Sequence, residues 1–111
     1  MEQLIEMASS LGLRIAAHER TTLLKQAQKA VNEDAEAGGL IKQYQQQAEK
    51  IGQLEQEQKP VEVADKQKLR EIEQKISTNE KLKELTHRQV DFVEMMHKVK
   101  QTLDGELQLE Q

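Results

Sequence analysis

Residues 79–107, NEKLKELTHRQVDFVEMMHKVKQTLDGEL, decide the fold of this chain. Apolar side chains recur along this stretch at steps of three and four residues, which is the spacing of one face of an α-helix. The members of this stripe are Leu82, Leu85, Phe92, Met96, Val99 and Leu103. Gln89 is the one polar residue in register, and the only glycine, Gly105, lies near the end of the run. The pattern predicts one long amphipathic helix.

The length of this helix has a consequence for assembly. A helix over 79–107 would be roughly 43 Å long at about 1.5 Å per residue, whereas a compact domain of this chain length has a radius of gyration of only about 13 Å. We therefore expect part of the stripe to be buried against a second copy, with a dimer as the expected state. The residues expected to contact a second copy or another protein partner are Leu82, Leu85, Gln89, Phe92, Met95, Met96, Val99 and Leu103.

The composition points to an all-α protein. Of the 111 residues, 36 % are hydrophobic and 2 % aromatic, values that also occur in disordered chains. A disordered segment has no reason to keep its apolar residues on one face, so the periodicity indicates a folded chain. Residues with high helix propensity dominate and β-branched residues are few, which favours helices throughout.

Breaks in the apolar pattern divide the chain into five helices within a single helical domain over 1–111. The expected ranges are about 2–17, 20–33, 35–58, 61–76 and 79–107. Because the turn around Pro60 is short, the third and fourth helices should form an antiparallel hairpin. We expect these two and the long C-terminal helix to form the main antiparallel bundle of an oligomeric protein.

Several polar residues are placed to define the helix ends. Asp34 is suited to accept from the free N–H groups of the third helix as its N-cap. Pro60 fits the first position of the fourth helix. The last helix has two possible caps, either Ser77 with Glu80 as a capping box or Asn79 alone. His18 lies at the end of the first helix, where a histidine interacts well with the negative pole.

Charge and composition exclude several classes of function. A net charge of −4 and two aromatic residues do not favour direct DNA binding or stacking on single strands. The chain has no cysteine, which excludes disulfides and thiolate chemistry. No apolar run approaches the roughly 20 residues of a membrane span, and the first residues do not resemble a signal peptide, so we expect no membrane contact and a cytoplasmic location. Lysines around the fourth helix alternate with carboxylates, which is typical of a solvated face, with an RNA-facing strip as the alternative.

The clearest candidate for metal chemistry is Glu-x-x-His, which occurs at Glu84–His87 and again at Glu94–His97. Ferritin-like di-metal sites use two such motifs, but they take them from two different helices. Here both copies lie on one helix, about 15 Å apart along its axis, and away from its apolar stripe. We therefore expect no metal, no cofactor and no catalytic residue, and we interpret the protein as a non-enzyme.

The order of motifs along the chain resembles a known family. The segments that carry the resemblance are Leu11–Ile15, Lys25–Ala27, the Asn32–Asp34 break, Leu40–Gln45, the Lys59–Pro60 turn and Asn79 before the long helix. Together they are similar to the YlbF/YmcA family of small bacterial helical proteins, including its YheA-type members. The resemblance covers nearly the whole chain.

The resemblance implies a cytoplasmic, all-helical, oligomeric protein without enzymatic activity of its own. Some members of the family act as accessory factors of a ribonuclease complex and thereby affect competence, sporulation and biofilm formation. Certain members hold an iron–sulfur cluster through cysteines, a property that does not transfer to this cysteine-free chain. The function we expect is that of an adaptor or regulatory protein that self-associates and binds protein partners. The alternatives are a structural or chaperone-like homo-oligomer with no dedicated partner and a metal-dependent enzyme.

Overall fold

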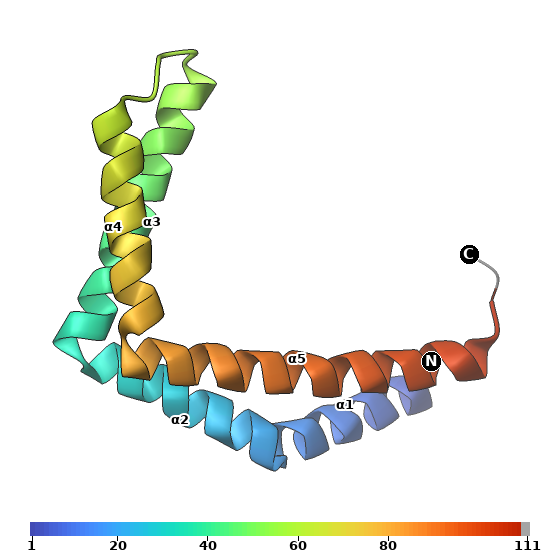
Figure 1. The fold of residues 1–111 in the computed structure, drawn as a ribbon. Helices are drawn as coiled ribbons and strands as arrows, with labels where there is room; N and C mark the ends of the chain where they lie inside the picture. The colour runs from blue at the N-terminus through green and yellow to red at the C-terminus, as the bar shows by residue number, and fades with distance from the viewer. Residues whose placement is uncertain (110–111) are drawn as a thin grey trace. The chain divides into compact units, whose positions relative to one another are not determined.

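A computed structural model describes residues 1–109 of the chain (Figure 1). These residues form five α-helices and no strand: α1 (Glu2–Ala17), α2 (Glu19–Glu33), α3 (Ala35–Gln56), α4 (Val63–Thr78) and α5 (Glu80–Leu107). The all-α fold with a long C-terminal helix is confirmed, since α5 extends over 28 residues without a break. None of the five helices combines the length and the apolar character that a membrane span requires.

The chain divides into two compact units. The first unit combines residues 1–28 with the described part of 85–111, and the second is Lys29–Glu84. Most of α5 therefore groups with α1 and the start of α2, whereas we had expected it to bundle with α3 and α4. The organisation of 1–111 as a single domain stays a prediction.

The unit Lys29–Glu84 is built on the antiparallel hairpin of α3 and α4, which confirms the pairing expected from the short turn (Figure 1). Its buried apolar side chains come from four helices: Val31, Ala37, Leu40, Ile72 and Leu82. Leucine and isoleucine side chains removed from water in this way supply most of the stability of a small helical unit, at about 1.5–3 kcal/mol each.

A polar cluster crosses the hairpin beside this core. The Nε2 group of Gln47 donates to the backbone oxygen of Asp65 at 2.9 Å, and Lys50 Nζ donates to Asp65 Oδ1 at 2.9 Å. The hydrogen bond from Lys50 is the main cause of a lowered pKa of the Asp65 carboxyl, with smaller contributions from the charge of Lys50 and from the backbone of Glu62. The cluster fixes the register of α4 against α3.

The turn between α3 and α4 differs from the expected one. Helix α3 ends at Gln56 instead of about 58, because Gln58 has a positive φ of 58° and closes the helix. The N–H of Gln58 donates to the oxygen of Glu55 and the N–H of Lys59 to that of Leu54, which together form a Schellman motif. The chain thereby reverses without a glycine.

Helix α4 begins at Val63, so the expected start at 61 and the helical position of Pro60 are wrong. A helix starting at Pro60 would need Lys59 as its N-cap, and a lysine side chain has no acceptor. Asp65 instead accepts from the N–H of Glu62, which places the helix start two residues later than expected.

Asp34 and Asn79 cap the N-termini of α3 and α5. Asp34 Oδ2 accepts from the N–H of Ala37 at 3.0 Å, which confirms Asp34 as the N-cap of α3. Helix α4 continues to Thr78, beyond the expected end at 76, and Ser77 bonds back to Gln74 inside it. Asn79 Oδ1 accepts from the N–H of Leu82 at 3.0 Å, so Asn79 and not Ser77 caps α5.

Candidate functional site

The unit of residues 1–28 and 85–109 has almost no interior. Helix α1 has no buried residue, and neither do the described residues from 85 onward. The buried side chains of this unit are Thr21 and Ala27, both on α2. Its exposed large apolar side chains are Leu4, Ile5, Met7, Leu11 and Leu13 on α1 and Val90, Val93, Leu103 and Leu107 on α5. Apolar helix faces left open on this scale are typical of surfaces that bind protein.

The accessible area supports this interpretation. The chain exposes 9160 Å². A compact monomer of this length exposes roughly 6,300 Å², and two independent compact units of half the length would together expose roughly 7,600 Å². The excess over the second value is about 1,600 Å², which is about twice the area that each partner buries in a protein–protein interface of standard size.

The eight residues predicted to form the interface lie in different surroundings along α5. Leu82 is only 3 % exposed and is buried by its own chain, so the surface proposed below begins after it. Leu85, Phe92, Met95, Met96 and Val99 are half-buried, and Gln89 and Leu103 are exposed. The stripe is thus covered at its start and open towards its C-terminal end. The role of these residues as an interface stays a prediction.

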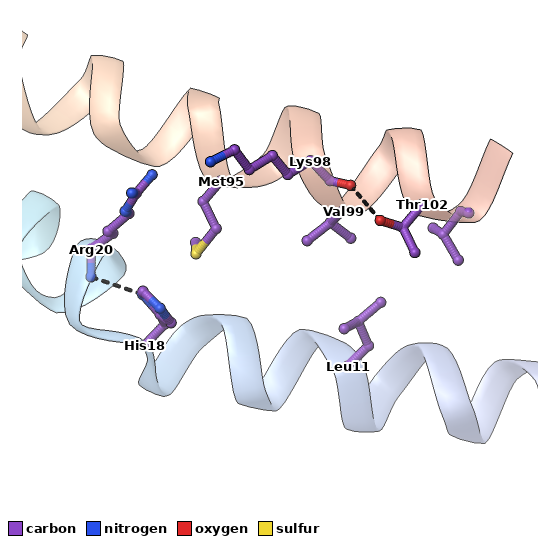
Figure 2. A pocket seen from close by; sticks show the side chains of 8 residues that line it. Leu11, His18, Arg20, Met95, Lys98, Val99 and Thr102 are labelled. Atoms are coloured by element: carbon purple, nitrogen blue, oxygen red, sulfur yellow. Dashed lines mark hydrogen bonds between the residues drawn. The ribbon is translucent and has the colours of Figure 1, made fainter. Parts of the chain in front are cut away.

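A groove of about 540 Å³ runs between α1 and α5. Figure 2 shows Leu11 on α1 pointing towards α5, with Met95 and Val99 pointing back towards α1. The residues that line the groove are Leu11, His18, Arg20, Met95, Lys98, Val99, Thr102 and Leu103. The floor is therefore apolar and is supplied by both helices.

The junction of α1 and α2 positions one end of this groove. Only His18 separates the two helices, and its Nδ1 atom accepts from the N–H of Arg20 at 3.1 Å (Figure 2). His18 thus accepts a hydrogen bond at the start of α2, in addition to its place at the end of α1. Thr21 Oγ1 donates to the oxygen of Ile15 at 2.6 Å and ties α2 back to α1.

Arg20 connects this junction to α5. Its Nη1 group donates to the backbone oxygen of Asp91 at 2.9 Å. On the neighbouring turn of α5, Lys98 Nζ lies 3.2 Å from Glu94 Oε1. The hydrogen bond and charge of Lys98, followed by the charge of Arg20, lower the pKa of the Glu94 carboxyl. Both cations therefore act on one carboxylate at the rim, and none of the eight lining residues is itself an acid.

A second groove of about 470 Å³ lies on the other flank of the α5 stripe. Its lining residues are Val93, Met96, His97, Val99, Lys100 and Leu103, all from α5. Val99 and Leu103 border both grooves and form a ridge between them. Among the described residues, none from α1 or α2 lines this second groove.

The two Glu-x-x-His motifs do not converge on a metal site. In residues 1–109, no group of three or more histidine, aspartate or glutamate side chains comes together. His97 lines the second groove, whereas Glu94 pairs with Lys98. His87 Nε2 lies 3.7 Å from Asp91 Oδ2, one turn further along α5.

Sequence reasoning found the apolar stripe of α5 but not the groove beside it. The residues predicted to form an interface all lie between 82 and 103, although the apolar residues of α1 are exposed as well. Arg20 and Lys98 carried no signal, because isolated cations on amphipathic helices are common.

The fold is thus an all-helical one with an apolar surface and, among the described residues, no metal-binding cluster. A family profile shows to which protein family the chain belongs. The chain belongs to the family described as control of competence regulator ComK, YlbF/YmcA, whose profile matches residues 4–108. This confirms the resemblance noted from the motifs. A comparison with curated protein sequences gave no match.

Among solved structures, one of Bacillus subtilis RicA in complex with RicF is similar to this chain. The TM-score is 0.81 at 20 % sequence identity, and the match covers 91 % of this chain and 90 % of that one. At this level of identity the likeness shows a shared fold. The neighbour was crystallised together with another protein.

Proposed function

We propose that this protein is a non-catalytic helical adaptor that self-associates and binds other proteins through α1 and α5. The observation that carries the proposal is the open apolar surface of residues 1–28 and 85–109, a unit with only two buried side chains. A helical unit of this kind gains its stability from a face packed against another element, a place that we assign to another protein molecule.

Two further observations support the proposal. The family is described as controlling a competence regulator, which is a regulatory and not a metabolic role. The similar structure of RicA contains a second protein, RicF. By family resemblance, the partners of the adaptor belong to a ribonuclease complex, in which this chain would act as an accessory factor in RNA processing.

We propose one part of this surface as the contact with a second copy. We assign it to the flank of α5 that carries Val93 and Met96 together with the open end of the stripe at Leu103. The excess area of about 1,600 Å² leaves room for a self-interface of standard size, about 800 Å² per partner, and for a second partner of similar extent.

Self-association is tested by placing a charge on this flank. Met96→Asp, and independently Phe92→Asp, should reduce the mass in light scattering to that of one chain, because an isolated carboxylate in an apolar interface is strongly unfavourable. Gln101→Asp is the control, since Gln101 is exposed, lines neither groove and lies about 140° around α5 from Met96 at about 100° per residue. Circular dichroism confirms that each variant remains helical. A helical Met96→Asp variant with the mass of the parent would show that the interface lies elsewhere.

Partner binding is tested by affinity purification from the native host. One stoichiometric partner supports the adaptor, whereas a spread of unfolded clients supports the chaperone-like alternative. The ribonuclease role predicts in addition that deletion of the gene leaves specific transcripts uncut in the host, as mapped by sequencing of RNA ends. Unchanged RNA ends would remove the ribonuclease role and leave the adaptor proposal to the purification result.

A further inference from the structure

We infer that the groove between α1 and α5 is a docking site for an acidic amphipathic helix of a partner protein. This inference rests on the proposed function and deepens it, because it gives the partner a chemistry and a place. The site adjoins the Val93 and Met96 flank that we assign to the second copy, and Val99 and Leu103 border both surfaces.

The shape of the groove fits a helix. Its α5 side presents Met95, Val99 and Leu103, which are four residues apart and extend over about 12 Å along one face. Such a row receives two turns of a partner helix that carries apolar residues at i, i+3, i+4 and i+7. Leu11 closes the opposite wall, so the bound helix would contact α1 and α5 together. Met95 can adapt to different apolar side chains because its thioether is flexible.

The charge at the rim fits a carboxylate. Arg20 and Lys98 line the groove, and no lining residue is acidic. Glu94 stands beside them and pairs with Lys98, which leaves one positive charge in excess in this group of three. The carboxylate of Asp91 is directed to its own helix, 3.9 Å from Arg88. His18 Nδ1 accepts from the backbone N–H of Arg20. Opposite charges across such a rim select the partner and speed its association.

The N-terminal helix of a second copy does not fit this description. The apolar face of α1 includes Leu4 and Leu11, whereas its carboxylates are at Glu2 and Glu6. At about 100° per residue, positions 2 and 6 lie about 160° around the helix from position 4. A second copy that inserted its apolar face would therefore point its carboxylates away from Arg20 and Lys98. The occupant must carry acids on the flanks of its apolar face.

The probe is a pair of synthetic helical peptides with the same leucine pattern at i, i+3, i+4 and i+7. One carries glutamates on both flanks of the apolar face, and the other carries lysines at the same positions. Fluorescence anisotropy with the full-length protein should show the glutamate peptide binding about tenfold more tightly, and the difference should shrink as salt is added. Equal affinities for the two peptides would overturn the inference.

Two neighbouring substitutions locate the binding. Lys98→Glu should abolish the preference for the glutamate peptide, whereas Lys100→Glu should keep it. The two variants make the same change in charge two residues apart, but Lys100 lines the second groove. Loss of the preference in Lys100→Glu, or its persistence in Lys98→Glu, would place binding outside this groove.

Glu94→Gln tests whether Lys98 recognises the carboxylates of the peptide or only stabilises α5 through its ion pair with Glu94. Lys98→Glu and Glu94→Gln both break the pair, so a structural effect would weaken binding in both variants. If the groove recognises carboxylates, Glu94→Gln should instead strengthen binding of the glutamate peptide, because it frees Lys98 and removes a negative charge from the rim. Weaker binding in Glu94→Gln would contradict the inference. Circular dichroism of each variant excludes unfolding as the cause.

The mass of Lys98→Glu distinguishes this inference from the proposed self-association. The variant should keep the oligomeric mass of the parent while losing its peptide preference. A fall to the mass of one chain would mean that the second copy occupies the groove, which overturns the inference but not the adaptor proposal. Conversely, a peptide preference that follows Lys98 stands even if Met96→Asp leaves the mass unchanged.

Discussion

Leu82 and Leu103 belong to the same apolar stripe of the same helix, yet Leu82 is 3 % exposed and Leu103 is 53 % exposed. The difference follows from the unit in which each residue lies. Leu82 belongs to Lys29–Glu84, where the α3–α4 hairpin supplies two further helices and a buried core. Leu103 belongs to the other unit, where α1 is the main neighbour and has no buried residue. One unit stabilises itself, and the other exposes the surface that we assign to binding.

The two units also differ in their polar contacts. In Lys29–Glu84 the hairpin holds Gln47, Lys50 and Asp65 in one cluster, with Asp65 buried. In the other unit, Arg20 reaches a backbone oxygen of α5, and the ion pair of Lys98 and Glu94 lies on the surface of one helix. Ion pairs on an exposed helix surface contribute little to stability, so the unit of residues 1–28 and 85–109 depends on what covers its apolar faces.

The largest expected effect tests this comparison directly. Leu82→Ala should reduce the free energy of unfolding by about 2–5 kcal/mol, because it leaves a cavity in a packed core. Leu103→Ala should reduce it by less than about 1 kcal/mol at concentrations where the protein has the mass of one chain, since much of the side chain is in water. Urea denaturation followed by circular dichroism measures both. Equal losses would mean that the end of α5 has a core of its own.

A smaller effect is expected from Asp65, at the polar cluster of the hairpin. The lowered pKa of this carboxyl means that the folded state favours the charged form, so its contribution to stability is present above the ordinary value of 3.8. That contribution is lost as the pH falls from this value through the lowered pKa. Asp65→Asn should therefore destabilise the protein at pH 7 and flatten the dependence of its stability on pH below 4.

The measurement is a series of urea titrations between pH 2.5 and 7. Glu94 provides the control, because its carboxyl also has a lowered pKa but lies on the exposed surface of α5. Glu94→Gln should change the pH dependence less than Asp65→Asn. An unchanged pH dependence in Asp65→Asn would show that the cluster does not contribute to the stability of the hairpin.

The sequence was sufficient for the helices and for some of their ends. The apolar stripe of α5 could be predicted from the spacing of its apolar residues. Asp34 could be predicted as the N-cap of α3, because a short carboxylate before a helix accepts from the free N–H groups of its first turn. The start of α4 differs from the expected one, because Pro60 suits a first helical position but Lys59 before it offers no acceptor for an N-cap. Periodicity shows which face of a helix is apolar, but not which helix covers it. The grouping of α5 with α1, and hence the groove, therefore required the three-dimensional structure.

The smallest expected effect concerns Gln58, in the turn of the self-sufficient unit. Its φ of 58° lies in the left-handed region, which costs a residue with a Cβ about 1–2 kcal/mol relative to the right-handed one and costs glycine almost nothing. Gln58→Gly should therefore raise the free energy of unfolding by up to about 1 kcal/mol, once the greater freedom of glycine in the unfolded chain is subtracted.

Gln58→Ala is the matched control, because it removes the side chain but keeps the Cβ and its strain. Urea denaturation should show stabilisation in Gln58→Gly and almost none in Gln58→Ala. The oligomeric mass and the peptide preference should be unchanged in both variants, since the turn belongs to Lys29–Glu84 and the grooves belong to the other unit. Equal stability of the two variants would mean that the turn relaxes out of the left-handed conformation in solution. A change in mass would instead show that the hairpin takes part in assembly, and the division of roles between the two units would then be incorrect.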